Sequence, residues 1–354
     1  MKNKLLISTG GSGGHVIPAF ILNQHLQNEN DIIISTDKRG TKFIRQDINN
    51  LKIINTPKLG NFFLVPFNLI VIFFLTLKSI FLLKSEKITT MISTGGYMSL
   101  PLIIASKFLG LKIFLLEPNL VLGRANRYFL NSCAKIICYT DRIKNFPDKF
   151  RDKIVTINPL VREEFYKTHT FKEKKNEFVL SIVGGSQSAS IFDEILKKPI
   201  VNISKKYALK VIHQTTEKNI FNLKNFYSKN NIKCEIFSFN NNFLNLVKKS
   251  DFCISRAGAS TLAELSILNI PFLAVPLPNS KDNHQYENAN FYKNEDCCWI
   301  LNQDILSEKF EEFLIGILRD KASLSKKKEN LKKLNYQNSW INVNQKILRI
   351  INEN

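Results

Sequence analysis

The chain has 354 residues, of which 44% are hydrophobic and 23% charged, so it is long enough for two domains of ordinary size, and its composition excludes an intrinsically disordered chain. Its formal net charge of +20 fits an anionic partner (nucleic acid, an anionic membrane surface or a phosphate-rich substrate), but lysines scattered over a solvated surface explain the charge equally well. The six cysteines include no C-x-x-C pair, which argues against a zinc site and indicates reduced thiols in the cytosol.

The first half of the chain alternates predicted strands with predicted helices. Pro18 suits the first turn of a helix over 19–27, and a second helix is expected over 102–110. Short apolar runs that end at glycines or polar residues predict buried strands. These runs lie at 4–8, 31–36, 89–94, 112–119, 134–140 and 153–158. The alternation indicates a parallel sheet that is covered by helices on both faces.

Residues 62–84 form the most apolar segment of the chain and include six phenylalanines. Their uninterrupted apolar stretch, 69–75, is short of the ~20 residues that a membrane-spanning helix needs, so a span is not expected. Lysines lie beside the segment at positions 58, 78, 84 and 87. Two interpretations remain open, a helix that docks on a membrane surface and a helix buried in the protein core.

A charged stretch at 162–177 breaks the alternation and is the best linker candidate. The second half then repeats the pattern, with strand, glycine turn and helix over 178–196, a loop and helix over 256–268, and helices from about Ser323 onward. Further strands are expected at 208–215, 233–239, 251–255 and 271–276. The predicted fold class is α/β, with two Rossmann-like domains of mostly parallel sheets whose strand ends face a central cleft.

The stretch STGGSGGHVIPAF, residues 8–20, carries four glycines followed by His15. Its spacing fits neither the G-x-G-x-x-G dinucleotide fingerprint nor a P-loop, but a glycine loop between strand and helix is where backbone N–H groups attract anions. Close approach of a ligand is the favoured interpretation, with His15 as a general base or a phosphate ligand. The alternative is a tight turn with an incidental histidine.

Two later loops repeat this design. TGGYMSLP (94–101) does so in the first half, and two such loops on one sheet edge suggest a diphosphate-bearing ligand unless this one is a structural turn. VGGSQSAS (183–190) lies before a helix, where its amides and the Ser186 hydroxyl are suited to hold phosphate.

Two more segments of the second half carry polar groups toward the same cleft. In 255–265, Glu264 either accepts the hydroxyls of a ribose or closes a capping box with Thr261. In 279–290, Gln285 faces the cleft unless the run is an ordinary polar loop. The sequence contains no D-x-D pair, so neither a carboxylate-held metal ion nor another cofactor is expected.

In order and spacing these segments resemble the MurG family, the peripheral membrane N-acetylglucosaminyltransferases of bacterial peptidoglycan synthesis. The segments that carry the resemblance are GGSGGHVIPA (10–19), GGYMSLP (95–101), EPNLVLGRANR (117–127), GGSQSA (184–189), SRAGASTLAEL (255–265) and KDNHQYENA (281–289). The resemblance implies a GT-B fold. Its domains would be 1–160, which faces acceptor and membrane, 161–335, which binds the donor, and a C-terminal helix, 336–354, that packs back on the first.

The resemblance also implies an activity, inverting transfer of GlcNAc from UDP-GlcNAc to the C4 hydroxyl of MurNAc on undecaprenyl-diphosphate-MurNAc-pentapeptide (lipid I), which gives lipid II. It places the protein on the cytoplasmic face of the plasma membrane, bound to anionic lipid, in cell wall biogenesis and cell division. Other cell-wall synthesis proteins are possible partners, and nucleic acid is not expected. The rival activities are those of a diacylglycerol glycosyltransferase, a UDP-sugar hydrolase or a UDP-sugar 2-epimerase.

Carried over by motif, the resemblance assigns catalysis to His15 and Glu117. It assigns acceptor binding to Gly95, Gly96 and Tyr97. It assigns donor binding to Ser12, Gly13, Gly14, Asn119, Arg162, Ser186, Asn240, Ala259, Ser260, Thr261, Leu262, Ala263, Glu264 and Gln285. The chain departs from the family pattern at Pro118, Ser188 and Leu100, and NPLVR (158–162) has one residue more than the family's usual form.

Overall fold

The computed structural model describes residues 3–44, 50–58, 62–168, 176–185, 190–238 and 243–353. The chain divides into two compact units. The first unit combines Met1–Leu160 with Trp340–Asn354, and the second unit is Val161–Ser339.

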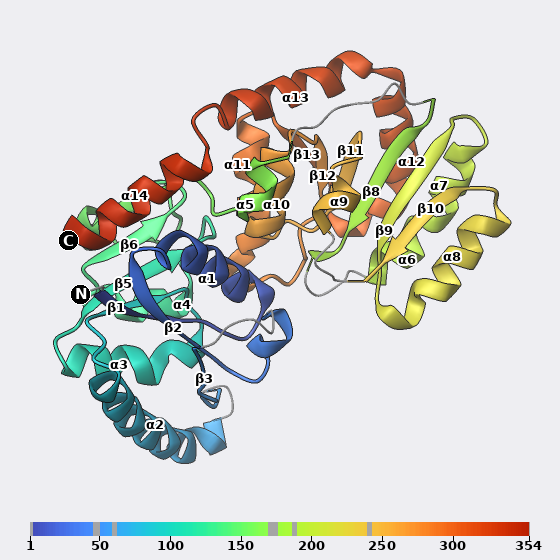
Figure 1. The fold of residues 1–354 in the computed structure, drawn as a ribbon. Coiled ribbons are helices and arrows are strands. Elements are labelled where there is room, and N and C mark those ends of the chain that lie inside the picture. The colour runs from blue at the N-terminus through green and yellow to red at the C-terminus, as the bar shows by residue number, and fades with distance from the viewer. Residues whose placement is uncertain are drawn as a thin grey trace. The chain divides into compact units, whose positions relative to one another are not determined.

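The first unit is built on a seven-stranded parallel sheet with the order β3-β2-β1-β4-β5-β6-β7 (Figure 1). Its strands are β1 (Asn3–Ser8), β2 (Asn30–Thr36), β3 (Leu51–Ile53), β4 (Thr90–Ser93), β5 (Lys112–Glu117), β6 (Lys135–Cys138) and β7 (Ile154–Thr156). In the interior strand β1, Leu5 pairs with Ile32 of β2 on one side and with Thr90 of β4 on the other. Leu5 is buried in one core of the unit and its neighbour Leu6 in another, as expected for a strand covered on both faces.

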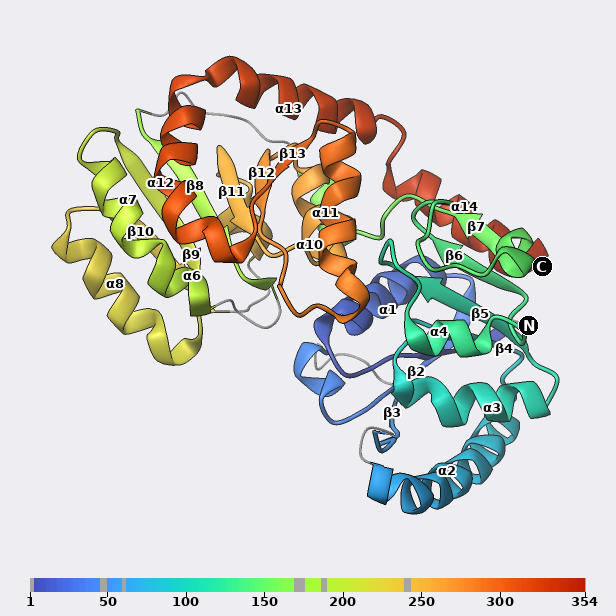
Figure 2. The ribbon, with the colours of Figure 1, turned by 180° about the vertical axis from the view of Figure 1, so that it is seen from behind.

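Helices cover both faces of this sheet (Figures 1 and 2). One face carries α1 (Gly13–Leu26) and α14 (Trp340–Glu353), whose side chains share a core with β1. The other carries α3 (Leu100–Phe108) and α4 (Arg124–Phe129), and α2 (Val65–Ser85) packs against α3. His25 of α1 stacks on Trp340 with ring centroids 3.6 Å apart, so the chain's last helix is part of this unit's core.

Helix α1 begins earlier than the sequence pattern predicts. It starts at Gly13, so Gly13 and His15 are helical, and Pro18 lies inside the helix rather than in its first turn. The turn itself uses Gly10 and Gly11, whose φ angles of 153° and 80° are ones that L side chains rarely adopt. The prediction took every glycine as loop, whereas only those with positive φ make the turn.

The second unit has a six-stranded parallel sheet with the order β10-β9-β8-β11-β12-β13. Its strands are β8 (Phe178–Val183), β9 (Leu209–Gln214), β10 (Lys233–Phe237), β11 (Phe252–Ser255), β12 (Phe272–Ala274) and β13 (Cys298–Ile300). Its helices are α5 (Glu163–Tyr166), α6 (Ser190–Ile195), α7 (Lys197–Ser204), α8 (Ile220–Lys229), α9 (Phe243–Val247), α10 (Ala259–Ile267), α11 (His284–Asn294), α12 (Gln303–Arg319) and α13 (Lys321–Leu334). A buried cluster covers each face of this sheet. Val183 of β8 belongs to one cluster and its neighbour Ile182 to the other.

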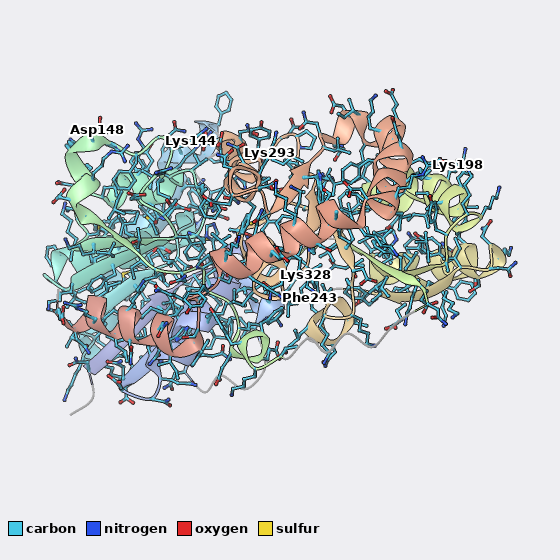
Figure 3. All side chains as sticks on the ribbon, turned by 90° about the horizontal axis from the view of Figure 1, so that it is seen from above. Lys144, Asp148, Lys198, Phe243, Lys293 and Lys328 are labelled. Atoms are coloured by element: carbon cyan, nitrogen blue, oxygen red, sulfur yellow. The ribbon has the colours of Figure 1, made fainter. Side chains whose placement is uncertain are left out.

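The predicted fold class of two Rossmann-like domains with parallel sheets is confirmed. The sequence patterns missed the short strands β3 and β13 and several helices, namely α4, α5, α7, α8, α9, α11 and α12. Lysines of the second unit project from different helices, as Figure 3 shows for Lys198 on α7, Lys293 on α11 and Lys328 on α13.

Candidate active site

In each unit, two of the predicted loops leave the carboxyl ends of neighbouring strands where the strand order reverses. In the first sheet the chain runs from β1 toward β3 and then from β4 toward β7, so the reversal lies between β1 and β4. In the second sheet it lies between β8 and β11. Open parallel sheets bind ligands in the crevice beside such a reversal. Each unit therefore has a candidate ligand site built from the loops that the sequence singled out.

In the first unit, His15 joins the first glycine loop to the second. Its Nδ1 lies 2.7 Å from the carbonyl oxygen of Thr94. Because a carbonyl only accepts, Nδ1 carries the hydrogen, and the neutral ring has its lone pair on Nε2. The ring also lies against Gly95, where an added Cβ would come within 3.3 Å of His15 Cε1, and Gly95 and Gly96 have φ angles of +90° and +86°. The second loop thus needs glycine at these positions for its backbone and, at Gly95, for close approach to the imidazole.

A cluster that the sequence analysis missed connects the same two loops. Asp37 Oδ1 accepts hydrogen bonds from the amides of Gly11 at 2.8 Å and Gly40 at 2.9 Å, and Arg39 Nε donates to Asp37 Oδ2 at 2.9 Å. The Arg39 guanidinium bonds the Tyr97 hydroxyl and lies 5.2 Å from the centre of its ring. Burial alone would raise the pKa of Asp37, but these donors outweigh it and hold that pKa below its usual value. The signal was a carboxylate and an arginine directly after β2, the neighbour of β1.

Glu117, at the end of β5, is a buried side chain that accepts several hydrogen bonds. Its Oε2 accepts from the amide of Gly123 at 2.7 Å and from Asn126 Nδ2 at 3.0 Å, and its Oε1 accepts from the amide and side chain of Asn119. Burial raises the pKa of Glu117 despite these donors. A Cβ on Gly123 would come within 2.8 Å of the carboxylate. The geometry places Glu117 where it shapes the loop that carries Asn119.

In the second unit, the predicted nucleotide segment forms the first turns of α10. The helix begins at Ala259 with Gly258 as its N-cap, so Thr261 and Glu264 lie inside it. The capping-box interpretation is therefore wrong, because Thr261 is three residues too late to cap the helix. The candidate residues of this segment, all on α10, are Ala259, Ser260, Thr261, Leu262, Ala263 and Glu264.

Glu264 is buried and paired with Arg162, which is the N-cap of α5. Arg162 Nε and Nη2 lie 3.1 and 3.0 Å from Glu264 Oε1. The other oxygen, Oε2, accepts no hydrogen bond within the described part of the chain. Burial raises the pKa of Glu264, and Arg162 opposes that shift. The arginine also reaches Glu164, whose Oε1 is 3.1 Å from Nη1. Arg162 and Glu264 are thus brought together across 102 positions of sequence.

The remaining donor candidates are placed in part. Gln285 lies in the first turn of α11 and its Oε1 accepts from the amide of Leu277 at 3.0 Å. Ser186 and Asn240 lie outside the described residues. Ser12 is the N-cap of α1, with Gly13 and Gly14 following it. In the described ranges, no three His, Cys, Asp or Glu side chains gather as they would around a metal ion.

The apolar segment forms α2, 21 residues long, and it is not a core helix. By length and composition alone α2 would suffice to cross a membrane, and the prediction that it does not span one stays a prediction. One stripe of the helix is buried, namely Asn68, Ile72, Ser79 and Leu83. The outward stripe of α2 is exposed, namely Phe67, Ile70, Phe74, Leu77 and Phe81. Phe74 and Phe81 are 63% and 75% exposed, which a soluble surface ordinarily avoids in a continuous stripe.

Comparison with known proteins identifies both halves of the chain. Residues 5–138 match the glycosyltransferase family 28 N-terminal domain, and residues 179–339 match the glycosyltransferase family 28 C-terminal domain. The chain is 48% identical to a protein of Pelagibacter ubique (strain HTCC1062) named UDP-N-acetylglucosamine--N-acetylmuramyl-(pentapeptide) pyrophosphoryl-undecaprenol N-acetylglucosamine transferase, over 100% of both chains. A protein of the same name from Rickettsia bellii (strain RML369-C) is 33% identical over 93% of this chain and 95% of its own.

Among solved structures, the chain is similar to MurG of Acinetobacter baumannii, with a TM-score of 0.77 over 100% of both chains. The two sequences are 21% identical, so this likeness shows a shared fold.

Proposed function

The chain belongs to glycosyltransferase family 28, and to the MurG family within it, and from that premise we propose that it transfers N-acetylglucosamine from UDP-GlcNAc to lipid I. The acceptor atom is the C4 hydroxyl of the MurNAc group, the anomeric configuration inverts, and the product is lipid II. One observation carries the proposal, the 48% identity that extends over the whole length of both chains. An identity confined to one half would support only a shared donor or acceptor domain.

We assign the general base to His15. Its Nδ1–H is engaged by the Thr94 carbonyl, so Nε2 is the atom that takes a proton. The acceptor hydroxyl attacks the anomeric carbon from the face opposite UDP and passes its proton to Nε2, while the bond to the diphosphate breaks. Glu117 serves this step indirectly, because its two oxygens already accept four hydrogen bonds from Asn119, Gly123 and Asn126.

We assign the nucleotide of the donor to α10 of the second unit. Glu264 offers Oε2 to the ribose hydroxyls while Oε1 stays with Arg162. A buried carboxylate that is held by an arginine is a fixed acceptor, which costs little reorganisation when the ribose binds. Ser186, Asn240 and Gln285 remain donor-binding predictions from the family resemblance.

We further propose that the outward stripe of α2 docks the first unit on the anionic inner leaflet, where a lipid-linked acceptor resides. The opposite stripe of α2 packs on α3, so the helix lies along the surface of its unit rather than standing free of it. Lys78 and Lys84 are exposed on the same helix and gain roughly 1 kcal/mol each near anionic lipid. This arrangement is that of an interfacial amphipathic helix.

The deciding experiment is a transfer assay with UDP-GlcNAc and a short-chain lipid I analogue, in the presence of EDTA. We expect the β-linked disaccharide product and no requirement for a divalent metal ion. Parallel reactions with diacylglycerol, and with no acceptor, test the rival activities of a glycolipid transferase, a UDP-sugar hydrolase and a 2-epimerase. Failure to form the disaccharide, or turnover with diacylglycerol alone, refutes the proposal.

A further inference from the structure

The start of the third glycine loop, Gly184 and Gly185, is held by a buried side chain from the neighbouring strand. Gln214, the last residue of β9, is 2% exposed. Its Oε1 accepts from the amides of both Gly184 and Gly185 at 3.0 Å, and its Nε2 donates to the carbonyl oxygen of Gly185 at 3.1 Å. Three hydrogen bonds thus join one carboxamide to two successive residues of the loop, at the point where Gly185 takes a φ of +73°.

The same end of β9 also holds the helix that follows the loop. Asp193 of α6 is 3% exposed, and its Oδ2 accepts from Thr215 Oγ1 at 2.5 Å and from Asn219 Nδ2 at 2.6 Å. Its Oδ1 lies 3.1 Å from Nε2 of His213, a fully buried ring whose Nδ1 is 3.0 Å from the Tyr227 hydroxyl. Both flanks of the loop, Gly184–Gly185 before it and α6 after it, are therefore fixed to consecutive residues of one strand end.

This arrangement changes how the loop is expected to bind an anion. The amides of Gly184 and Gly185 point at Gln214, so they are occupied and do not form the phosphate cradle that their sequence suggests. Gly185 nonetheless follows β8 at the reversal of strand order between β8 and β11, and a Cβ added to it would lie 3.7 Å from Thr261 Oγ1 of α10. A loop that approaches a ligand at such a point must be held to within a fraction of an ångström to bind well.

We propose that Gln214 is a positioning residue for the UDP-sugar, which acts by clamping Gly184 and Gly185 in one geometry beside α10, the helix to which the donor nucleotide is assigned. This inference rests on the proposed function, since it takes a nucleoside diphosphate sugar as the donor. Gln214 touches the loop backbone and not the ligand, and the His213–Asp193 pair steadies the other flank of the loop.

The test uses the full-length protein and measures UDP binding by calorimetry, together with the KM of each substrate. In Gln214→Met, which keeps side-chain volume and removes all three hydrogen bonds, the Kd for UDP and the KM for UDP-GlcNAc should rise on the order of tenfold, since small displacements of a binding element are costly. The KM for the lipid I analogue should stay unchanged. Gln214→Glu keeps an oxygen for the two amides but sets its second oxygen against the Gly185 carbonyl oxygen, so it too should weaken UDP binding.

Asn330→Ala is the matched control. Asn330 is another side-chain amide of the second unit that bonds backbone, with its Nδ2 3.0 Å from the carbonyl oxygen of Asp296, but it lies on α13 away from the loop. It should lower the melting temperature without altering UDP affinity.

Should both Gln214 variants bind UDP as wild type does, or should Asn330→Ala weaken UDP binding equally, the positioning role is overturned while the transferase function stands. A wild-type protein that binds UDP but makes no disaccharide overturns the proposed function and leaves the clamp testable; one that binds no UDP overturns both.

Discussion

At the scale of the residue, His15 is distinguished by having a single defined tautomer. The contact of 2.7 Å to the Thr94 carbonyl requires a hydrogen on Nδ1. In His15→Asn the side-chain amide is able to keep a donor near this carbonyl but offers no basic nitrogen. We expect kcat to fall by about 10²- to 10⁴-fold, the range that general-base catalysis contributes, with little change in the KM for UDP-GlcNAc. Steady-state kinetics with the lipid I analogue measure both quantities.

The control for this prediction is His25→Asn on the same helix, which replaces a buried imidazole that stacks on Trp340. It should lower the melting temperature of the protein more than it lowers kcat. A His15→Asn variant whose kcat stays within a few-fold of wild type would exclude His15 as the base.

Glu264 offers a second residue-scale prediction because two carboxylates share one arginine. Arg162 pairs with Glu264 through Oε1 and with Glu164 through its Nη1, but only Glu264 is assigned to the ribose. In Glu264→Gln the Kd for UDP should rise about tenfold, the equivalent of one charged hydrogen bond of about 1.5 kcal/mol. A UDP analogue that lacks both ribose hydroxyls should bind the variant and the wild type alike.

Glu164→Gln is the matched control, since it removes the charge of the arginine's other partner. It should leave UDP affinity unchanged. Equal losses in the two variants, or an equal loss for the analogue without ribose hydroxyls, would mean that Glu264 acts only by holding Arg162.

At the residue scale, the sequence predicted which loops carry the candidate site residues. It did not predict which of their atoms are already engaged in hydrogen bonds within the protein. The glycine loops and His15 were found because spacing along the chain places them between a strand and a helix. The pair of Arg162 with Glu264 and the clamp of Gln214 on Gly184 were not found, because both join segments that only the folded chain brings together. No sequence pattern predicts a hydrogen bond between a side chain and a group that is distant along the chain.

At the scale of the element, α2 is an apolar helix that leaves many of its large apolar side chains exposed. We predict that the double variant Phe74→Ser/Phe81→Ser partitions at least about tenfold less onto anionic vesicles, because each phenylalanine that leaves the lipid gives up more than 1 kcal/mol of apolar burial. Transfer to a short-chain, water-soluble acceptor should be unaffected. Co-sedimentation with phosphatidylglycerol vesicles measures the partitioning.

The matched control is Phe221→Ser on α8 of the second unit. Phe221 is 72% exposed, so the change in surface hydrophobicity is comparable, but it lies on a different unit from α2. It should leave vesicle binding as in wild type. If the wild-type protein ignores anionic vesicles, or if Phe221→Ser matches the double variant, the outward stripe of α2 is not a lipid-docking face.

The strands of both sheets were predictable as elements because buried parallel strands are continuous apolar runs bounded by glycines or polar residues. β3 and β13 were missed, whereas β7 and β12, which are also three residues long, were predicted. α12 was missed although Leu306, Phe310, Leu314 and Ile317 follow helical spacing, since charged residues separate them. The start of α1 was placed too late because Gly13 and Gly14 read as loop, and nothing local distinguishes a helical glycine from one with positive φ.

At the scale of the whole molecule, the chain builds its two units differently. The second unit is one continuous stretch, whereas the first takes α14 from the far end of the chain. Within that unit Val343 and Ile347 are fully buried and Ile351 nearly so, in the core that includes Leu5 and Leu22. Each such side chain contributes about 1.5–3 kcal/mol, so the loss of α14 removes a stabilisation comparable to the ~5–15 kcal/mol of a whole domain.

Fragments of the chain test this division. We predict that residues 161–339 fold alone and bind UDP, and that residues 1–160 alone show no cooperative unfolding in urea. Residues 1–160 joined through a short glycine-serine linker to 340–354 should regain a cooperative transition, because the linker restores α14 to the core at modest entropic cost. Circular dichroism followed along a urea titration distinguishes the three fragments. If residues 1–160 alone unfold cooperatively at the same midpoint as the joined fragment, α14 does not stabilise the core of the first unit.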